Sequence, residues 1–300
     1  IAQVLLRISA KLSLKRAAAS SLESLRRLRR RLPWKGVKTD MSEMVLTVNN
    51  LKKLYKNNRG VKKLSLEIEK GDVIGLLGPN GSGKTTALKT IVGLCHADEG
   101  EIEIFGHNID TEFEKAMENV GALIETPAIY DRMTAYQNLK MAARFYYHID
   151  KSIDEDRINE VLSLVNLDRY SRDKAGKFSL GMRQRLGIAL ALLSNPKLVI
   201  LDEPTNGLDI EGVVHIRNVI KHMSERHGTT FLVSGHVASE LEKICNKVAV
   251  IYEGELKAFE TMENVLDKQP SLEEFFLSVV NDAKGDIFRF ADRGNNNEQN

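Results

Sequence analysis

Long apolar runs and cysteines are what this sequence most clearly lacks. No stretch of 18 or more residues is continuously apolar, so we expect no helix that spans a membrane unaided. The two cysteines, Cys95 and Cys245, lie far apart and in no spacing typical of a metal or redox site. This pattern indicates a reducing compartment with buried thiols, and it argues against a disulfide-held scaffold.

An excess of positive charge is also lacking outside one end of the chain. Residues 1–40 hold 11 of the 43 Lys and Arg residues and 2 of the 41 acidic residues, so residues 41–300 carry a net charge of −7. A mildly acidic body carries no footprint of nucleic-acid binding, and we expect no nucleic-acid partner. Because the chain begins on Ile1 while Met41 precedes the first strand pattern, we expect residues 1–40 to be a non-native or upstream-translated basic extension. A basic helix that touches a membrane surface or a partner, and a transit peptide, remain alternatives.

The strongest motif in the sequence is a glycine-rich loop. Residues 78–85 match the phosphate-binding pattern G-x-x-x-x-G-K-[ST], between an apolar strand pattern at 73–77 and a helix pattern at 87–92. In such a loop, backbone N–H groups converge on phosphates at the positively polarised start of a helix. We expect Lys84 to reach the β- and γ-phosphates and the Thr85 hydroxyl to ligate Mg²⁺. The candidate phosphate-binding residues are Gly78, Pro79, Asn80, Gly81, Ser82, Gly83, Lys84, Thr85 and Thr86.

A pair of acids forms the second strong signal. Asp202 and Glu203 directly follow residues 198–201, a short apolar run typical of a parallel strand covered on both faces. Open α/β sheets bind ligands at the carboxyl ends of such strands. We expect Asp202 to hold Mg²⁺ through water, and Glu203 to orient or deprotonate an attacking water.

The segment 127–196 has helical periodicity and interrupts the strand patterns, which predicts a helical subdomain that contacts something other than the nucleotide. Thr134 with Gln137, and Ser152 with Glu155, have the spacing of capping boxes that open helices. We expect one globular domain over residues 41–280, followed by a polar tail at 281–300 that is too poor in apolar residues to fold.

Three further candidates are weak when taken alone. Tyr55 lies in a polar loop ahead of the glycine loop, where its ring would stack on a purine. Asp209 opens a helix that we expect to end at Gly228. His236 is the one histidine of seven at the end of a core strand pattern.

Taken in order, these motifs resemble the nucleotide-binding subunit of an ATP-binding-cassette (ABC) transporter, over residues 44–277. The resemblance implies an α/β P-loop NTPase fold with a mostly parallel core sheet, a small antiparallel β-subdomain and an inserted helical subdomain. It makes Tyr55 an adenine-stacking aromatic, Asp209 the D-loop acid, and His236 a γ-phosphate sensor. Ser179 and Gly181 match the family signature, whose N–H groups contact the γ-phosphate held by a second subunit.

Two positions depart from the family pattern. Residues 178–182 read Phe-Ser-Leu-Gly-Met, so the first glycine and the glutamine of the signature are replaced. Glu125 stands where the family has the Q-loop glutamine, and its added negative charge would bind Mg²⁺ more tightly. With residues 179–187, this glutamate is similar to the bacitracin-resistance and lantibiotic-immunity ATPases of Gram-positive bacteria.

The resemblance implies an enzyme that binds ATP and Mg²⁺ and hydrolyses ATP between two copies of the chain. One phosphate loop and no membrane span imply a separate permease partner and a peripheral place on the cytoplasmic face of the membrane. Export of a peptide antibiotic, a lantibiotic or a similar amphiphile follows from the narrower resemblance. Two ATPases of other function are the alternatives: a DNA-repair type, which carries a long coiled coil between the two nucleotide motifs, and a translation factor, which carries two cassettes. Here Lys84 and Asp202 lie close in sequence without sustained heptads, and there is a single phosphate loop.

Overall fold

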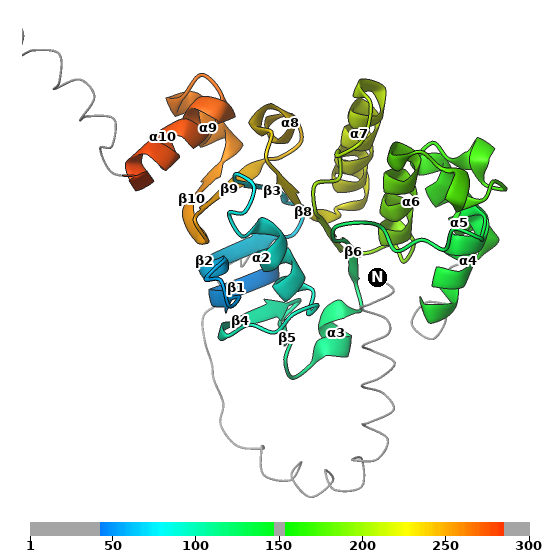
Figure 1. Cartoon of the computed structure of the whole chain (residues 1–300), viewed down its shortest axis with the longest axis horizontal. Helices are drawn as coiled ribbons and strands as arrows, with labels where there is room; N and C mark the ends of the chain where they lie inside the picture. Colours follow the sequence, from blue (N-terminus) through cyan, green and yellow to red (C-terminus); the bar gives the residue numbers. More distant parts are fainter. Residues whose placement is uncertain (1–42, 147–153, 285–300) are drawn as a thin grey trace, which may run out of the picture.

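A computed structural model describes residues 43–146 and 154–284 (Figure 1). The basic extension at 1–40, the capping residue Ser152 and most of the expected polar tail lie outside these residues. The expected boundary of that tail is placed too early, because the last helix, α10 (Leu272–Lys284), continues past residue 280.

One sheet organises the described part of the chain. Its strands lie in the order β5-β4-β1-β2-β10-β9-β3-β8-β7-β6. They are β1 (Met44–Leu54), β2 (Gly60–Glu69), β3 (Val73–Leu77), β4 (Glu99–Ile104), β5 (His107–Asn108), β6 (Val120–Leu123), β7 (Leu198–Leu201), β8 (Thr230–Gly235), β9 (Lys247–Tyr252) and β10 (Glu255–Thr261).

The sheet has a parallel part and an antiparallel part, as the sequence predicted. Strands β9, β3, β8, β7 and β6 pair in parallel, whereas β1, β2, β4 and β5 pair antiparallel. The two parts join through β10, which pairs with β9 and meets β2 at one position, Glu255 opposite Lys63. In Figure 1 the antiparallel strands β1, β2, β4 and β5 lie low in the view, and helices α4 to α6 lie at its right.

Nine helices and two 3₁₀ turns surround the sheet in the described ranges. They are α2 (Lys84–Ile91), α3 (Phe113–Met117), α4 (Ala135–Tyr146), α5 (Glu155–Leu164), η1 (Asp168–Tyr170), η2 (Ala175–Lys177), α6 (Leu180–Leu192), α7 (Ile210–His227), α8 (Ala238–Glu242), α9 (Met262–Lys268) and α10. Within the described residues, none is both long and apolar enough to cross a membrane.

Strand alternation divides the core into two clusters, one on each face of the sheet. Every residue of β3, β6 and β7 is buried, which explains why these strands read as continuous apolar runs. In β7, Leu198 and Ile200 join the cluster that contains the apolar residues of α2. Val199 and Leu201 join the cluster that contains those of α6 and α7. Side chains that alternate along a strand therefore face different helices.

The helical segment between β6 and β7 begins as predicted and then differs in one cap. Thr134 and Gln137 form a reciprocal capping box, with each backbone N–H donating to the other's side-chain oxygen. Helix α5 is capped instead by Asp154, which accepts from the Arg157 N–H.

The structure also tests the predicted end of α7 and the predicted burial of the two cysteines. Helix α7 ends at Gly228 in the left-handed conformation, as expected. Cys245 is buried, and burial raises the pKa of its thiol, whereas Cys95 is only half-buried. The expectation of two buried thiols is therefore correct for Cys245 only.

Candidate functional site

The glycine loop joins the end of β3 to the start of α2 at the centre of the sheet. Gly81 and Gly83 adopt positive φ angles of 81° and 106°, which side chains rarely tolerate. A Cβ on Gly78 would lie 2.3 Å from the Ile251 carbonyl oxygen. Within residues 43–146 and 154–284, the buried Ser82 hydroxyl has no hydrogen-bond partner. The loop is therefore held by glycines in one tight path, and it offers an unpaired polar group.

The Lys84 side chain folds back and forms hydrogen bonds to the glycine loop. Its side chain is only 5% exposed, and its Nζ donates to the carbonyl oxygens of Gly78 at 2.7 Å and Pro79 at 3.1 Å. The same Nζ lies 3.8 Å from Glu203 Oε1. Burial lowers the pKa of Lys84, although the Glu203 and Asp202 carboxylates oppose this shift. A cation is thus held at the centre of a loop built for phosphates.

The predicted acids lie beside Lys84 at the carboxyl ends of parallel strands. The Asp202 side chain is buried and accepts a 2.6 Å hydrogen bond from the Ser234 hydroxyl. Glu203 has a φ of 46°, unusual for a residue with a side chain, and its carboxylate accepts from Asn206 Nδ2. His236 Nδ1 lies 3.4 Å from Glu203 Oε2. Lys84, Glu203 and His236, which follow β3, β7 and β8 in the chain, therefore converge.

Tyr55 lies at the rim of this site. Its side chain is 45% exposed, and its N–H donates to the Arg59 carbonyl in the turn between β1 and β2. That turn ends at Gly60, whose carbonyl oxygen is so close to Gly83 that a Cβ there would lie 2.6 Å from it. The turn that carries Tyr55 is thus in contact with the glycine loop.

The signature residues are not brought to the glycine loop. Ser179 caps α6 by accepting from the Met182 N–H, and a Cβ on Gly181 would lie 3.1 Å from the Gly207 oxygen. Asp209 caps α7 and lies 3.7 Å from Arg185 Nη2. Among the described residues, no hydrogen bond or ion pair joins Ser179 or Gly181 to Lys84. Gln184, on the same helix as Gly181, does reach the site by donating to the Glu203 carbonyl at 3.4 Å.

Glu125 is paired with a cation of α2. It follows β6 with a φ of 58°, and its Oε1 lies 2.6 Å from Lys89 Nζ. Among the described residues, no three His, Cys, Asp or Glu side chains gather closely enough to hold a metal ion by themselves. The Thr85 hydroxyl and the buried Asp202 carboxylate are nevertheless oxygen donors of the kind that Mg²⁺ prefers, so the residues present fit this ion.

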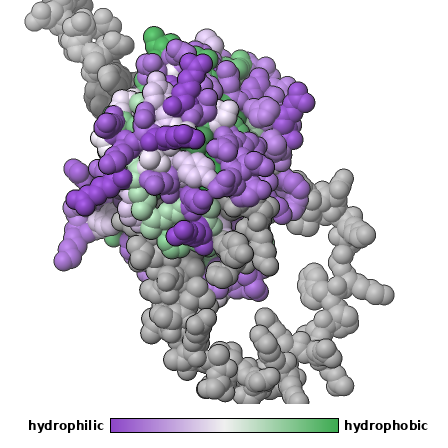
Figure 2. Space-filling model, turned by 90° about the vertical axis from the view of Figure 1, so that its right-hand side faces the viewer, coloured by the Kyte–Doolittle hydropathy of each residue, from purple (hydrophilic) through white to green (hydrophobic). Residues whose placement is uncertain are grey.

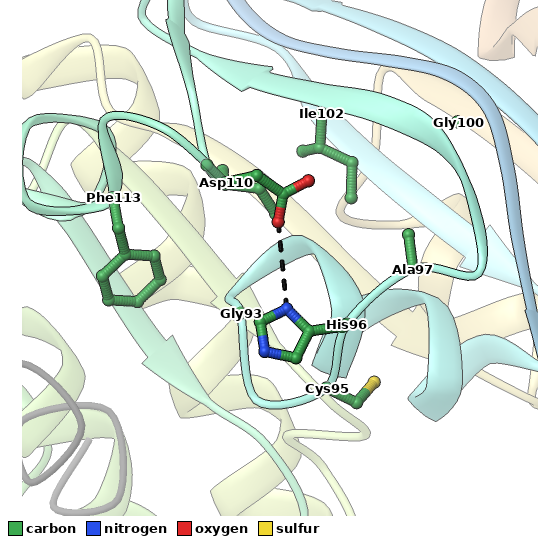
Figure 3. Close-up of a pocket in the computed structure, with 9 residues that line it drawn as sticks. Gly93, Cys95, His96, Ala97, Gly100, Ile102, Asp110 and Phe113 are labelled. Atoms are coloured by element: carbon green, nitrogen blue, oxygen red, sulfur yellow. Dashed lines mark ion pairs between the residues drawn. The ribbon is translucent and has the colours of Figure 1, made fainter. Parts of the chain in front are cut away.

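Two cavities that border the end of α2 differ in size and place. A cavity of about 170 Å³ lies between the ends of α2 and β6 and helix α6, and Glu125, Pro127 and Gly187 contribute to its wall. A smaller one of about 20 Å³ lies between the end of α2 and β4, where His96 and Asp110 face each other at 3.9 Å (Figure 3). The Cys95 thiol points away from that ion pair and lies 3.1 Å from the Thr90 hydroxyl. The smaller cavity is too small for a nucleotide.

Sequence reasoning missed two polar residues of the site. Ser234 contacts both acids, and Asn206 contacts Glu203. Their places in the sequence could have indicated them. Ser234 lies at a strand end two residues before His236, and Asn206 follows Glu203 by three residues.

Comparisons with known proteins agree with this geometry. The sequence profile of the family described as "ABC transporter" matches residues 61–206. The chain is 46% identical over 218 residues to an uncharacterized ABC transporter ATP-binding protein, YdbJ, of Bacillus subtilis (strain 168), covering 73% of this chain and 70% of YdbJ. It is 38% identical to the bacitracin transport ATP-binding protein BcrA of Bacillus licheniformis, covering 80% and 77% of the two chains. It is 36% identical to the lantibiotic transport ATP-binding protein SrtF of Streptococcus pyogenes, covering 79% and 97%.

Solved structures show the same fold. One, described as the ATP-binding subunit of an ABC transporter, superposes with a TM-score of 0.71 at 27% identity, over 79% of this chain and all of that one. Because relatives well above 30% identity are matched over more than two thirds of their length, the comparisons establish both family and activity. The chain belongs to the ATP-binding subunits of ABC transporters, which bind and hydrolyse ATP.

Proposed function

We propose that this chain powers a separately encoded permease that exports a peptide antibiotic, a lantibiotic or a similar amphiphile, and so supports immunity or resistance. The convergence of Lys84, Glu203 and His236 beside a glycine loop is the observation that carries the ATPase part. The substrate class is supported by likeness to the bacitracin and lantibiotic transport proteins. We place the chain on the cytoplasmic face of the membrane, as a peripheral subunit.

In this proposal the loop residues 78–86 bind the phosphates of ATP. Lys84 exchanges the Gly78 and Pro79 carbonyls for phosphate oxygens, an exchange favoured because a buried ammonium gains two charged partners in place of neutral ones. Thr85, Asp202 and Glu125 would hold Mg²⁺, which when bound neutralises charge on the phosphates. Tyr55 stacks on the adenine ring.

Glu203 and His236 act on the attacking water and the γ-phosphate. The Glu203 carboxylate orients the water and accepts its proton, while the Asn206 amide fixes the direction of that carboxylate. The His236 imidazole, 3.4 Å from Glu203, contacts the γ-phosphate. Lys84, whose Nζ lies 3.8 Å from Glu203 Oε1, stabilises the charge that develops on the transferred phosphoryl group.

A second copy of the chain supplies the rest of the site. Ser179 and Gly181 stand at the N-terminus of α6, where free backbone N–H groups favour an anion. They would contact the γ-phosphate bound to the other copy, with Asp209 at the contact between copies. This places two ATP molecules in a homodimer and leaves each signature segment separate from its own glycine loop. A solved ATP-binding cassette bound to ADP and Pi, 25% identical with a TM-score of 0.65, is described as dimeric.

The helical segment offers the surface on which a permease would dock. The cavity beside Glu125 opens next to Ala128 and Leu94. A broader hollow of about 830 Å³ on α4 combines apolar and basic side chains. It is lined by Arg132, Met133, Gln137, Lys140, Met141, Arg144 and Phe145. Figure 2 faces this side of the molecule and shows hydrophilic side chains around a smaller apolar area. We infer that a cytoplasmic segment of the permease, with apolar residues, binds here.

Purification from membranes tests the proposal. The full chain, tagged and carrying Glu203→Gln to prolong the ATP-bound state, is purified from detergent-solubilised membranes of a native host in ATP and Mg²⁺. We expect a small multi-span permease to co-purify, and to be lost when Lys84→Ala is added. Recovery of ribosomes or DNA-bound proteins without a membrane protein would contradict the transport function and leave the ATPase chemistry standing.

A further inference from the structure

Ser234 occupies the strand that separates the glycine loop from the acids. It lies on β8, between β3 and β7, opposite Leu76 of β3. Leu201 pairs with Val233, so the next residues along these parallel strands, Asp202 and Ser234, are neighbours in register. Alternation from Ile200 and Leu232, which pack in the α2 cluster, sends both side chains toward α2.

The Ser234 hydroxyl contacts both acid residues at once. Its Oγ donates to Asp202 Oδ1 at 2.6 Å and accepts from the Glu203 N–H at 2.9 Å. A hydroxyl has one proton to give, so donation to the carboxylate leaves its lone pairs for the amide. Ser234 is 1% exposed and Asp202 is 6% exposed, so water cannot easily replace either bond.

No lysine or arginine in the described residues lies within ion-pair distance of Asp202, so this hydroxyl is its side-chain partner. Glu203 is held by its backbone at a φ that residues with side chains rarely adopt. The Glu203 N–H bond to Ser234 is one of the contacts that fix this conformation. A single group therefore sets the direction of one carboxylate and the backbone that carries the other.

We infer that Ser234 is a positioning residue for ATP hydrolysis, which orients Asp202 toward the metal and holds Glu203 in place to activate water. This role rests on the proposed tasks of Asp202 and Glu203. If the Ser234 hydroxyl served only to complete hydrogen bonds in the core, its loss would lower the stability of the fold and nothing else. If it positions the two acids, its loss lowers kcat and metal affinity even where the stability is unchanged.

Three variants of the full chain separate these roles. Ser234→Ala deletes the hydroxyl, and Ser234→Thr keeps it in a residue suited to a strand. Ser224→Ala is the matched control, because its hydroxyl donates to the oxygen of Gly71, which lies before the amino end of β3, whereas Ser234 lies near the carboxyl end of β8. For each variant we would measure kcat and KM for ATP, the Tm, and binding of Mn²⁺ in the presence of ATP by electron paramagnetic resonance.

We expect Ser234→Ala to lower kcat by about tenfold to a hundredfold, the loss typical of a deleted bond to a charged group. The KM for ATP should change by less than about threefold, because the bond serves the transition state more than substrate binding. Mn²⁺ affinity should fall by about tenfold. Ser234→Thr should restore both values, and Ser224→Ala should change neither.

Wild-type kcat and wild-type Mn²⁺ affinity in Ser234→Ala would overturn the inference. A loss of kcat that merely follows a lower Tm, and that Ser224→Ala reproduces at the same Tm, would overturn it as well. Where the extra methyl of Ser234→Thr lowers the Tm, kcat is compared at equal intervals below each Tm. If the wild-type chain itself binds no Mn²⁺ with ATP, the proposed metal site fails, while the kcat comparison still decides the role of Ser234.

Discussion

The glycine loop at residues 78–85 and the signature segment at residues 178–182 each lead into a helix, α2 and α6, yet they are built differently. The loop is closed within the chain, since Lys84 reaches its carbonyls and lies near Glu203. The signature segment faces outward, since Leu180 is 64% exposed. Ser179 and Gly181 contact their own helix and the Gly207 turn, and not the loop. In the proposed dimer, one half of each site comes from the glycine loop of one copy and the other half from the signature segment of the second copy.

The largest expected effect is on kcat, and it comes from a change beside the glycine loop. Glu203→Gln should lower kcat by about a hundredfold to ten-thousandfold, because it removes the carboxylate that accepts a proton while keeping its shape. ATP should then hold two copies together without release. Light scattering after gel filtration in saturating ATP and Mg²⁺ would report the dimer. A monomer under these conditions would contradict the proposal that the ATP site is shared between two copies.

A smaller effect concerns Glu125 and Lys89, which are paired at 2.6 Å. Glu125→Gln should weaken apparent Mg²⁺ affinity by about tenfold, since it removes a charged oxygen ligand. Lys89→Met should strengthen it, because Lys89 no longer competes for the same carboxylate. Titration of ATPase activity with Mg²⁺ measures both. Shifts in the same direction would show that Glu125 is not a ligand. Stability should change by no more than about 0.5 kcal/mol in either variant, since the pair is partly exposed.

The smallest effect concerns stability and its pH dependence. Burial holds the pKa of Lys84 below 10.5, so the folded chain binds fewer protons than the unfolded chain between the lowered pKa and 10.5. Wild-type stability should therefore rise with pH through that window. Lys84→Met removes the buried charge, and it should raise the Tm near neutral pH by about 2–4 °C per kcal/mol gained. Its advantage should fade as pH approaches 10.5. Thermal melts of the wild type and Lys84→Met across this pH range would measure the trend.

Local patterns predicted the parts of this site that depend on consecutive residues. The glycine loop, the acids after β7 and the Thr134 cap each follow from a short motif with its own physical reason. Contacts between distant segments could not be predicted in this way. Ser234 meets Asp202 only because β8 pairs with β7 in one register, and Glu125 meets Lys89 only because β6 ends beside α2. The link through β10 likewise depends on one bridge between Glu255 and Lys63.

Mixing two inactive variants tests the central claim most directly. Lys84→Ala disables the loop half of a chain, and Ser179→Arg disables the displayed half. Each alone should be inactive. In a mixed dimer, one site receives both intact halves, so an equal mixture should recover up to about a quarter of wild-type ATPase activity if copies pair at random. Recovery would show that the halves come from different copies. No recovery, although an affinity tag on one variant pulls down the untagged other variant in ATP and so shows that mixed dimers form, would contradict the account.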